Sequence, residues 1–235
     1  MNGLTALRAL SNQNIAKLTA SSDFEIAQIR RKKTVIYFIT PPQHLEYYSF
    51  LISVFFRTVF NVCMRELPDK KTLPVYVLYD EFGHSMIPNF VSTANTIRGY
   101  RVSLSIVLQS IAQLSAQYGR EYAYSIQGGF NTYMTYSGSD PETVKFFETL
   151  CGRQRITQVN GKKDAMEHYR ESNLINANEI RTIPAGKALL ISSNRQPILL
   201  ETKPYFEVGR WARAAKKGAV SIGNTKSDRL AYVPL

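Results

Sequence analysis

The chain has 235 residues, which is enough for one large domain or two small ones. Hydrophobic residues make up 44% and charged residues 20% of the sequence, proportions that exclude a disordered or collagen-like chain. Lysine and arginine number 29 against 18 acidic residues, so the formal charge of +11 favours a polyanionic partner, either nucleic acid or anionic lipid.

Cysteine and histidine give no sign of a metal or redox site. Cys63 and Cys151 lie far apart in the sequence and match no metal-ligand spacing, which also excludes a disulfide scaffold. Cys63 lies in an apolar run, so we interpret it as a small buried hydrophobe. The three histidines form no zinc pattern.

The amino-terminal residues contain no long apolar core and no small-residue cleavage site, so no signal peptide is predicted. The most apolar stretch, 49–64, is interrupted by Arg57. It is shorter than the roughly 20 apolar residues that a membrane span needs, so we predict a buried helix and no transmembrane segment.

Apolar strands alternate with helices over residues 34–152. Dense β-branched and aromatic runs predict buried strands at 34–40, 74–80, 102–109 and 131–137. Helical patterns predict helices at 44–65, 89–98, 111–118, 123–127 and 141–150. Asp140 and Pro141 have the N-cap and first-turn chemistry that begins the last of these helices. This alternation predicts an α/β fold with a mostly parallel sheet flanked by helices.

The pattern changes after Gly152. Residues 155–159 predict a short strand, 160–173 a polar loop, and 178–183 a short helix. Two further strands, 187–192 and 197–203, would add a hairpin to the edge of the sheet. The last residues, 209–235, contain six basic residues and a single acidic one, Asp228, and we predict a partly disordered basic tail.

The most informative motif is the apolar strand that ends in Asp80 and Glu81. The carboxyl edge of a parallel sheet is where open α/β folds bind ligands. In RecA-like NTPases the first such carboxylate holds Mg²⁺, usually through water, and the second polarises the attacking water. The alternative is that Asp80 only ends a strand and that Glu81 is solvated.

The strand after the acidic one ends in Gln109 and Ser110. An uncharged amide at that position can sense the γ-phosphate, whereas the simpler interpretation is a polar pair in which Ser110 caps the next helix. Arg98 and Arg101 lie between the two strands. A guanidinium matches phosphate geometry, so either could act as an arginine finger on a neighbouring subunit; the alternative is an exposed arginine after a helix.

Several blocks of the sequence together resemble the TraG/TraD-type coupling proteins of conjugative type IV secretion. The blocks are residues 19–42, 73–90, 96–119, 138–152 and 178–206, in the order that the family shows. The resemblance implies a RecA-like ATPase that assembles as a homo-hexamer. It also implies that the motor receives a DNA–relaxase complex and drives single-stranded DNA, or protein, toward the type IV secretion channel proteins.

The resemblance further implies roles for individual residues. Asp80 and Glu81 match the Walker B pair, with Asp80 as the Mg²⁺ residue, and Gln109 matches the sensor glutamine. Arg98 matches the trans-acting arginine, with Arg101 as the fallback. ATP and Mg²⁺ are the implied cofactors, and the implied location is the cytoplasmic face of the inner membrane.

One departure from the family limits what this chain can do alone. The family carries a glycine-rich phosphate loop, GxxxxGK[ST], and the nearest candidates here, at Gly161 and Gly186, fail its spacing and its hydroxyl. Without that loop's amides and lysine, little remains to cradle the β- and γ-phosphates. We therefore expect poor ATP hydrolysis unless another chain supplies the loop.

This departure and the absence of the family's membrane helices lead us to interpret the chain as the carboxy-terminal half of a coupling protein. Residues 1–30 would be the returning end of a helical insertion, 31–208 the RecA-like domain without its phosphate-loop unit, and 209–235 the basic tail. A non-catalytic module that binds DNA or the relaxosome is the main alternative. A membrane-surface protein that uses the basic tail is a third, for which the sequence predicts no amphipathic helix.

Overall fold

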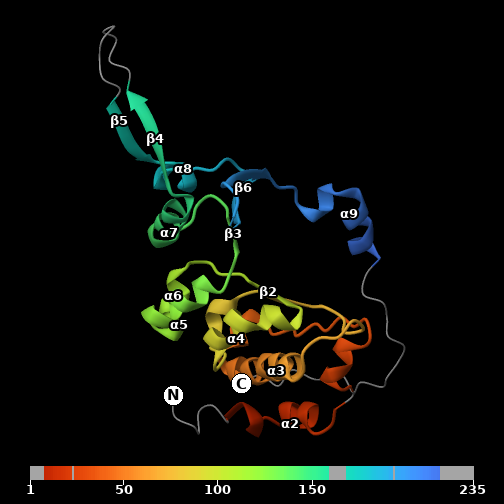
Figure 1. The fold of residues 1–235 in the computed structure, drawn as a ribbon. Helices are drawn as coiled ribbons and strands as arrows, with labels where there is room; N and C mark the ends of the chain where they lie inside the picture. The colour runs from red at the N-terminus through yellow and green to blue at the C-terminus, as the bar shows by residue number, and fades with distance from the viewer. Residues whose placement is uncertain (1–7, 23, 159–167, 193, 218–235) are drawn as a thin grey trace.

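The computed structural model of the chain describes residues 8–22, 24–158, 168–192 and 194–217 (Figure 1). The strands are β1 (Val75–Tyr79), β2 (Val102–Ile106), β3 (Thr132–Thr135), β4 (Arg153–Gln158), β5 (His168–Asn173), β6 (Lys187–Ser192) and β7 (Ile198–Glu201). The α-helices are α2 (Gln13–Thr19), α3 (Leu45–Met64), α4 (Phe90–Thr96), α5 (Ala112–Tyr118), α6 (Arg120–Gly128), α7 (Pro141–Cys151), α8 (Ala177–Arg181) and α9 (Gly209–Lys216). Short 3₁₀ turns separate them: η1 (Arg8–Ser11), η2 (Ile26–Arg30), η3 (Pro42–His44), η4 (Phe82–His84), η5 (Ile97–Tyr100) and η6 (Tyr205–Glu207).

The described strands form three separate sheets. β1 and β2 pair in parallel, with Val75 opposite Val102 and Tyr79 opposite Ile106. β3, β6 and β7 form an antiparallel sheet, and β4 and β5 form an antiparallel hairpin. The expected α/β class is confirmed, and so is the carboxy-terminal hairpin, which joins β3. The prediction that strands of residues 34–152 share one sheet is wrong, because β3 pairs with β6 and not with β2.

The predicted buried strand at 34–40 does not form. The segment has no regular secondary structure and belongs to none of the sheets, and Val35, Tyr37 and Ile39 are 74%, 82% and 86% exposed. A parallel strand is buried only when a neighbour takes its backbone hydrogen bonds and helices cover both faces, and among the described residues β1 pairs with β2 alone. High β-propensity without a partner therefore leaves this segment at the surface.

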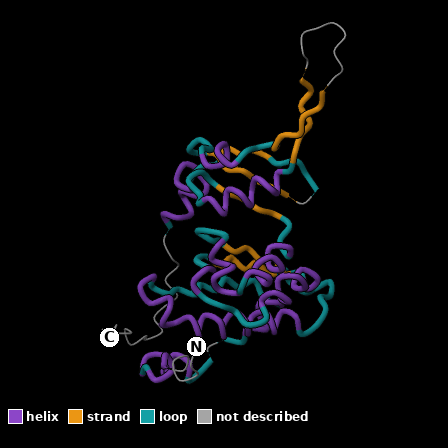
Figure 2. Tube along the Cα trace, turned by 90° about the vertical axis from the view of Figure 1, so that its left-hand side faces the viewer, coloured by secondary structure: helices purple, strands orange, loops and turns teal. Residues whose placement is uncertain are grey.

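The polar loop predicted at 160–173 is corrected in part. Residues 168–173 form β5, which pairs with β4 in a hairpin that stands clear of the helices (Figure 2), while 159–167 lie outside the described residues. An antiparallel hairpin satisfies its own backbone groups even when both faces meet water, so it needs no apolar alternation. The composition that suggested a loop is compatible with such a strand.

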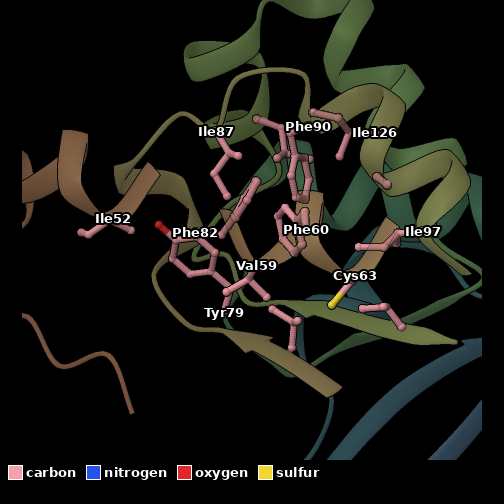
Figure 3. Close-up of a cluster of buried hydrophobic side chains, with 14 of the residues drawn as sticks. Ile52, Val59, Phe60, Cys63, Tyr79, Phe82, Ile87, Phe90, Ile97 and Ile126 are labelled. Atoms are coloured by element: carbon pink, nitrogen blue, oxygen red, sulfur yellow. The ribbon is translucent and has the colours of Figure 1, made fainter. Parts of the chain in front are cut away.

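The main core packs α3 and the helices around it against one face of the β1–β2 pair (Figure 3). Helix α3 contributes Ile52, Val59, Phe60 and Cys63, whose spacing puts them on one helical face. Cys63 is buried as predicted, and burial raises the pKa of its thiol. On β1, by contrast, Tyr76 and Leu78 point away from this core and are 73% and 81% exposed. Among the described residues, helices therefore cover one face of the parallel pair and leave the other exposed.

The helix that follows Pro42 has a second property that the sequence interpretation underestimated. Together η3 and α3, residues 42–64, are long and apolar enough to cross a membrane by length and composition alone. A core helix of a soluble protein passes the same test. Here one face of α3 packs on the β1–β2 core, while only 22% of the apolar window is buried, so the prediction of a buried helix holds for that face alone.

A second core joins α7, α8 and β6. Helix α7 begins as predicted, because the Asp140 side chain accepts the backbone N–H groups of Glu142 and Thr143, both at 3.1 Å. At the other end of α7, the buried Glu148 carboxylate accepts from Lys145 Nζ, from the Ala177 N–H at 3.0 Å, and from Asn173 Nδ2 at 2.8 Å. These bonds connect α7 to α8 and to β5.

Arg30 holds the starts of both parallel strands. Its buried guanidinium donates to the Leu73 carbonyl oxygen at 2.9 Å and to the Tyr100 carbonyl oxygen at 2.6 Å. Leu73 lies two residues before β1 and Tyr100 two residues before β2. The Arg30 carbonyl also accepts the Leu73 N–H at 2.9 Å, so one residue satisfies backbone groups on both segments.

Replacing Arg30 with alanine should destabilise the fold strongly. Two carbonyl groups would lose a charged donor, so we expect the free energy of unfolding to fall by about 3 kcal/mol. Urea denaturation followed by circular dichroism measures this change. The neighbouring Arg31 is exposed, so Arg31→Ala is the matched control and should cost less than about 0.5 kcal/mol. An equal loss of unfolding free energy in the two variants would contradict the role of Arg30 in holding the starts of both strands.

Glu148 should make stability depend on acidity. The Lys145 ammonium, then the Ala177 N–H, hold the pKa of this carboxyl below the ordinary value of a glutamate. Because the folded-state pKa is lowered, the ionised form stabilises the fold above about pH 4.3, and this contribution is lost as pH falls through the folded-state pKa. Wild type should therefore exceed Glu148→Gln in stability at neutral pH and approach it on acidification. A stability difference between the two that does not change with pH would contradict this.

Candidate functional site

The turn after β1 is strained at the residue that the sequence marked as catalytic. Glu81 has φ of 54°, in the left-handed region that non-glycine residues rarely adopt. Its N–H donates to Asp80 Oδ1 at 3.0 Å, and η4 begins at the next residue. Backbone strain of this kind costs about 1–3 kcal/mol and clusters at functional sites, so the turn is a candidate for one.

The structure brings two of the predicted site residues together. Gln109 Nε2 lies 3.3 Å and 3.4 Å from the two carboxylate oxygens of Glu81 and donates to them. The parallel register of β1 and β2 explains the contact, because the two strands end at the same edge of the pair. Glu81 and Gln109 therefore lie at one edge of the pair, while the roles of both residues stay predictions.

His84 is the residue that sequence reasoning missed. Its Nε2 lies 3.1 Å from Glu81 Oε2, on the opposite end of a single 3₁₀ turn, and both side chains are about half exposed. The sequence interpretation weighs this histidine only as a zinc ligand. Its spacing of three residues from Glu81 is the signal that could have found the contact, since i and i+3 side chains eclipse in a 3₁₀ turn.

Asp80 is exposed at the same edge, and its free carboxylate oxygen is compatible with one kind of Mg²⁺ site. Among the described residues, no group of three or more His, Cys, Asp or Glu side chains could hold a metal ion by itself. Mg²⁺ commonly binds through one or two carboxylates, several waters and the phosphates of a nucleotide. Asp80 therefore fits an ion that arrives with a nucleotide, and does not fit a site built from protein ligands alone.

Helix α5 holds this edge in place through two glutamines. Gln113 Oε1 accepts the Gln109 N–H at 3.0 Å, and Gln117 Nε2 donates to the Gly83 carbonyl at 2.9 Å. Gly83 allows the close approach, because a Cβ there would lie 2.5 Å from the Gln113 side chain. Ser110 Oγ accepts the Ala112 N–H at 3.1 Å from one position before the N-cap residue Ile111, so Ser110 supports the start of α5 without being its N-cap.

The two arginines lie at the other end of the parallel pair, before β2 begins. Arg101 is engaged in structure: its Nη1 donates to the Asp69 carbonyl at 2.9 Å and to the Thr72 carbonyl at 3.4 Å. Arg98 is exposed, and within the described residues its side chain has no hydrogen bond or ion pair. A five-residue strand spans about 16 Å, so neither guanidinium reaches Glu81 of its own chain.

A cleft of about 690 Å³ borders the same strand. Its lining includes β2 with its extension to Gln109, β3, and Arg98. In the described part of the chain β2 pairs only with β1, and β3 only with β6. Both strands therefore present an unpaired edge to the cleft.

Sequence comparison places this arrangement among known proteins. The family model for type IV secretory system conjugative DNA transfer matches residues 2–228. Protein VirD4 of Rhizobium rhizogenes is 24% identical over 198 residues, which cover 80% of this chain and 30% of that protein. Protein VirD4 of Rhizobium radiobacter is 25% identical over 202 residues, which cover 82% of this chain and 29% of that protein. The chain thus spans less than a third of the length of these relatives.

Solved structures show the same fold. The plasmid coupling protein TrwB in complex with the GTP analogue GDPNP superposes with a TM-score of 0.70 and 16% identity, over 84% of this chain and 47% of that chain. TrwB in complex with ADP and Mg²⁺ gives a TM-score of 0.66 and 17% identity, over 77% and 43% of the two chains. The expected RecA-like α/β fold is confirmed by these similarities.

The contact between Gly83 and Gln113 can be tested by a double-mutant cycle. Gly83→Ala should displace the flexible end of the Gln113 side chain, break its bond to the Gln109 N–H, and lower the free energy of unfolding by about 1 kcal/mol. Gln113→Ala should cost about 1 kcal/mol, through the lost bond to the Gln109 N–H. Because truncating Gln113 removes the clash, Gly83→Ala should cost less in the Gln113→Ala background.

Chemical denaturation of the single and double variants measures this coupling. Gln28→Ala changes an exposed glutamine far along the sequence and serves as the control background. Costs that add in the Gln113→Ala background as they do in the control background would rule out the close approach.

Proposed function

The chain belongs to the type IV secretory system conjugative DNA transfer family, and we propose that it supplies the residues that hydrolyse ATP in a coupling protein. In this proposal the assembled protein is a hexameric, ATP-driven motor at the cytoplasmic face of the inner membrane. It receives single-stranded DNA bound to a relaxase and delivers this substrate to the channel proteins of a type IV secretion system.

The contact between Glu81 and Gln109 is the observation on which the proposal rests. The Glu81 carboxylate would accept a proton from, and orient, the water that attacks the γ-phosphate. Gln109, which donates to that carboxylate, would sense whether the γ-phosphate is present. His84 would position the carboxylate from the other side. Mg²⁺, held by Asp80 and the nucleotide, would supply charge stabilisation.

The phosphate cradle would come from a segment outside these 235 residues. The sequence contains no GxxxxGK[ST] loop, and the cleft between β2 and β3 has an unpaired strand edge on each side. A unit that adds a strand between these edges would end beside Gln109 if it ran parallel to β2. A loop that follows that strand would then present its backbone amides to the phosphates at the carboxyl edge.

Arg98 would act on the nucleotide of a neighbouring subunit. Its exposure, and its position at the opposite end of β2 from Glu81, both support a role in trans. Arg101 is the weaker candidate, because its guanidinium already holds two carbonyl groups of the segment before β1.

A module that binds DNA or the relaxosome without catalysis is the second candidate function. The observation that favours it is the projecting hairpin, where Arg153, Arg155 and Arg170 are exposed. Guanidinium groups on such a hairpin would contact phosphates without regard to sequence. This candidate predicts normal DNA binding in variants that lack Glu81 or Arg98.

Mixed assemblies test the catalytic assignment. In a longer polypeptide, with a phosphate loop ahead of these residues, Glu81→Gln and Arg98→Ala should each lower ATP turnover at least about 10³-fold. Mixing the two variants should restore part of the activity, because some interfaces then pair an intact Glu81 with an intact Arg98. Steady-state phosphate release measures this recovery.

Two controls accompany the mixing experiment. The 235-residue chain alone should bind Mg·ATP weakly and release little phosphate, so normal turnover by the chain alone would contradict the supplied-loop proposal. Arg101→Ala should lower stability more than turnover, because it removes bonds to Asp69 and Thr72. Normal ATP turnover in both Arg98→Ala and Arg101→Ala would show that neither residue is an arginine finger.

A further inference from the structure

The segment 203–217, here named the carboxy-terminal arm, lies outside both hydrophobic cores. It comprises η6, α9 and the residues that flank them, and none of its residues is buried. The main tertiary contact of α9 is with η6. In Figure 1, α9 stands apart from the helices that surround β1 and β2.

The arm exposes three large aromatic side chains within seven residues. Tyr205, Phe206 and Trp211 are 59%, 64% and 48% exposed. Tyr and Trp combine an apolar ring with a polar group, a combination that favours a boundary between water and an apolar phase. A segment that keeps three such rings in water is built for contact with another surface.

The charge of the arm is strongly positive and unevenly distributed. The arm contains five basic residues and one acidic residue, Glu207, so its net charge is +4. On α9, Arg210 and Arg213 lie at i and i+3 and share one side of the helix axis, and Lys217, the C-cap residue after the helix, continues that side. The backbone positions of Trp211 and Ala215, at i and i+4, lie on the other side, and the Arg210 side chain reaches across so that its guanidinium lies over the Trp211 ring. The prediction that no amphipathic helix accompanies the basic tail is therefore wrong.

We propose that the carboxy-terminal arm binds the surface of a membrane that contains anionic lipid. The aromatic rings would enter the boundary between headgroups and acyl chains, with the arm lying in the plane of the surface. The long arginine and lysine side chains would extend to the lipid phosphates. This surface is separate from the Glu81 edge and does not depend on the proposed hydrolysis.

Single-stranded nucleic acid is a poorer match for the geometry of the rings. A base-stacking platform needs open ring faces on which successive bases lie. Tyr205 and Phe206 meet edge to face, with centroids 5.6 Å apart and planes at 79°. The Arg210 guanidinium lies over the Trp211 ring, 5.2 Å from its centroid, and covers one face. A lipid interface sets no such requirement on ring orientation.

The tryptophan fluorescence of the chain can measure this interaction without a label, because Trp211 is its single tryptophan. Titration with vesicles of phosphatidylglycerol and phosphatidylcholine in equal parts should shift the tryptophan emission to the blue. Vesicles of phosphatidylcholine alone should produce little shift. No blue shift with the anionic vesicles, or the same shift with both kinds, would overturn the proposal.

Charge variants separate the arm from the positive charge of the whole chain. Each cation near an anionic surface contributes about fivefold to partitioning, so Arg210→Glu with Arg213→Glu should weaken vesicle binding at least about 25-fold. Arg153→Glu with Arg155→Glu makes the same change in net charge on the β4–β5 hairpin and should weaken binding far less. An equal loss of vesicle binding in the two double variants would overturn the proposal. A Trp211 emission change that shows tighter binding to an oligothymidylate than to anionic vesicles would also overturn it.

Discussion

The parallel register of β1 and β2 is the constraint on which the candidate site depends. Because Tyr79 pairs with Ile106, both strands end at the same edge, and Glu81 and Gln109, which follow the two strands, meet there. A shift of one residue would move every side chain of one strand to the other face and separate Glu81 from Gln109. The chemistry proposed for this edge thus follows from a backbone pairing of only five residues.

Interactions at both ends hold this short pair in register. Before the strands, Arg30 binds carbonyl groups of the two incoming segments. After the strands, Gln113 and Gln117 of α5 hold the Gln109 backbone and the turn at Gly83. Between these ends, the Tyr79 ring stacks on Phe56 with centroids 4.2 Å apart, and its hydroxyl bonds the buried Ser85. Helix α3 thereby fixes the face of the pair that lies opposite the exposed Tyr76 and Leu78.

The surfaces left open have different characters. The exposed face of β1 and the segment 34–40 are apolar, and in the described part of the chain the cleft between β2 and β3 offers unpaired backbone groups. Such surfaces fit elements that complete a sheet. The carboxy-terminal arm instead combines aromatic rings with a positive charge. The chain therefore presents sheet-completing surfaces near its site and a charged, aromatic surface away from it.

Local signals in the sequence were enough to locate several of these elements. Strong β-branched and aromatic runs located β1 and β2, Asp140 located the start of α7, and the polar residues after each strand located Glu81 and Gln109 at one edge. Features that depend on partners distant in sequence emerged only on folding. Segment 34–40 has the composition of a strand, but no described strand pairs with it, and β3 joined β6 although its sequence fits a parallel strand equally well. The two arginines and His84 likewise differ only once the chain folds. Within the described residues the Arg98 side chain has no hydrogen bond, Arg101 binds two carbonyl groups, and His84 contacts Glu81. A residue's local sequence pattern does not contain the positions of its neighbours in space, so these contacts could not be predicted from it.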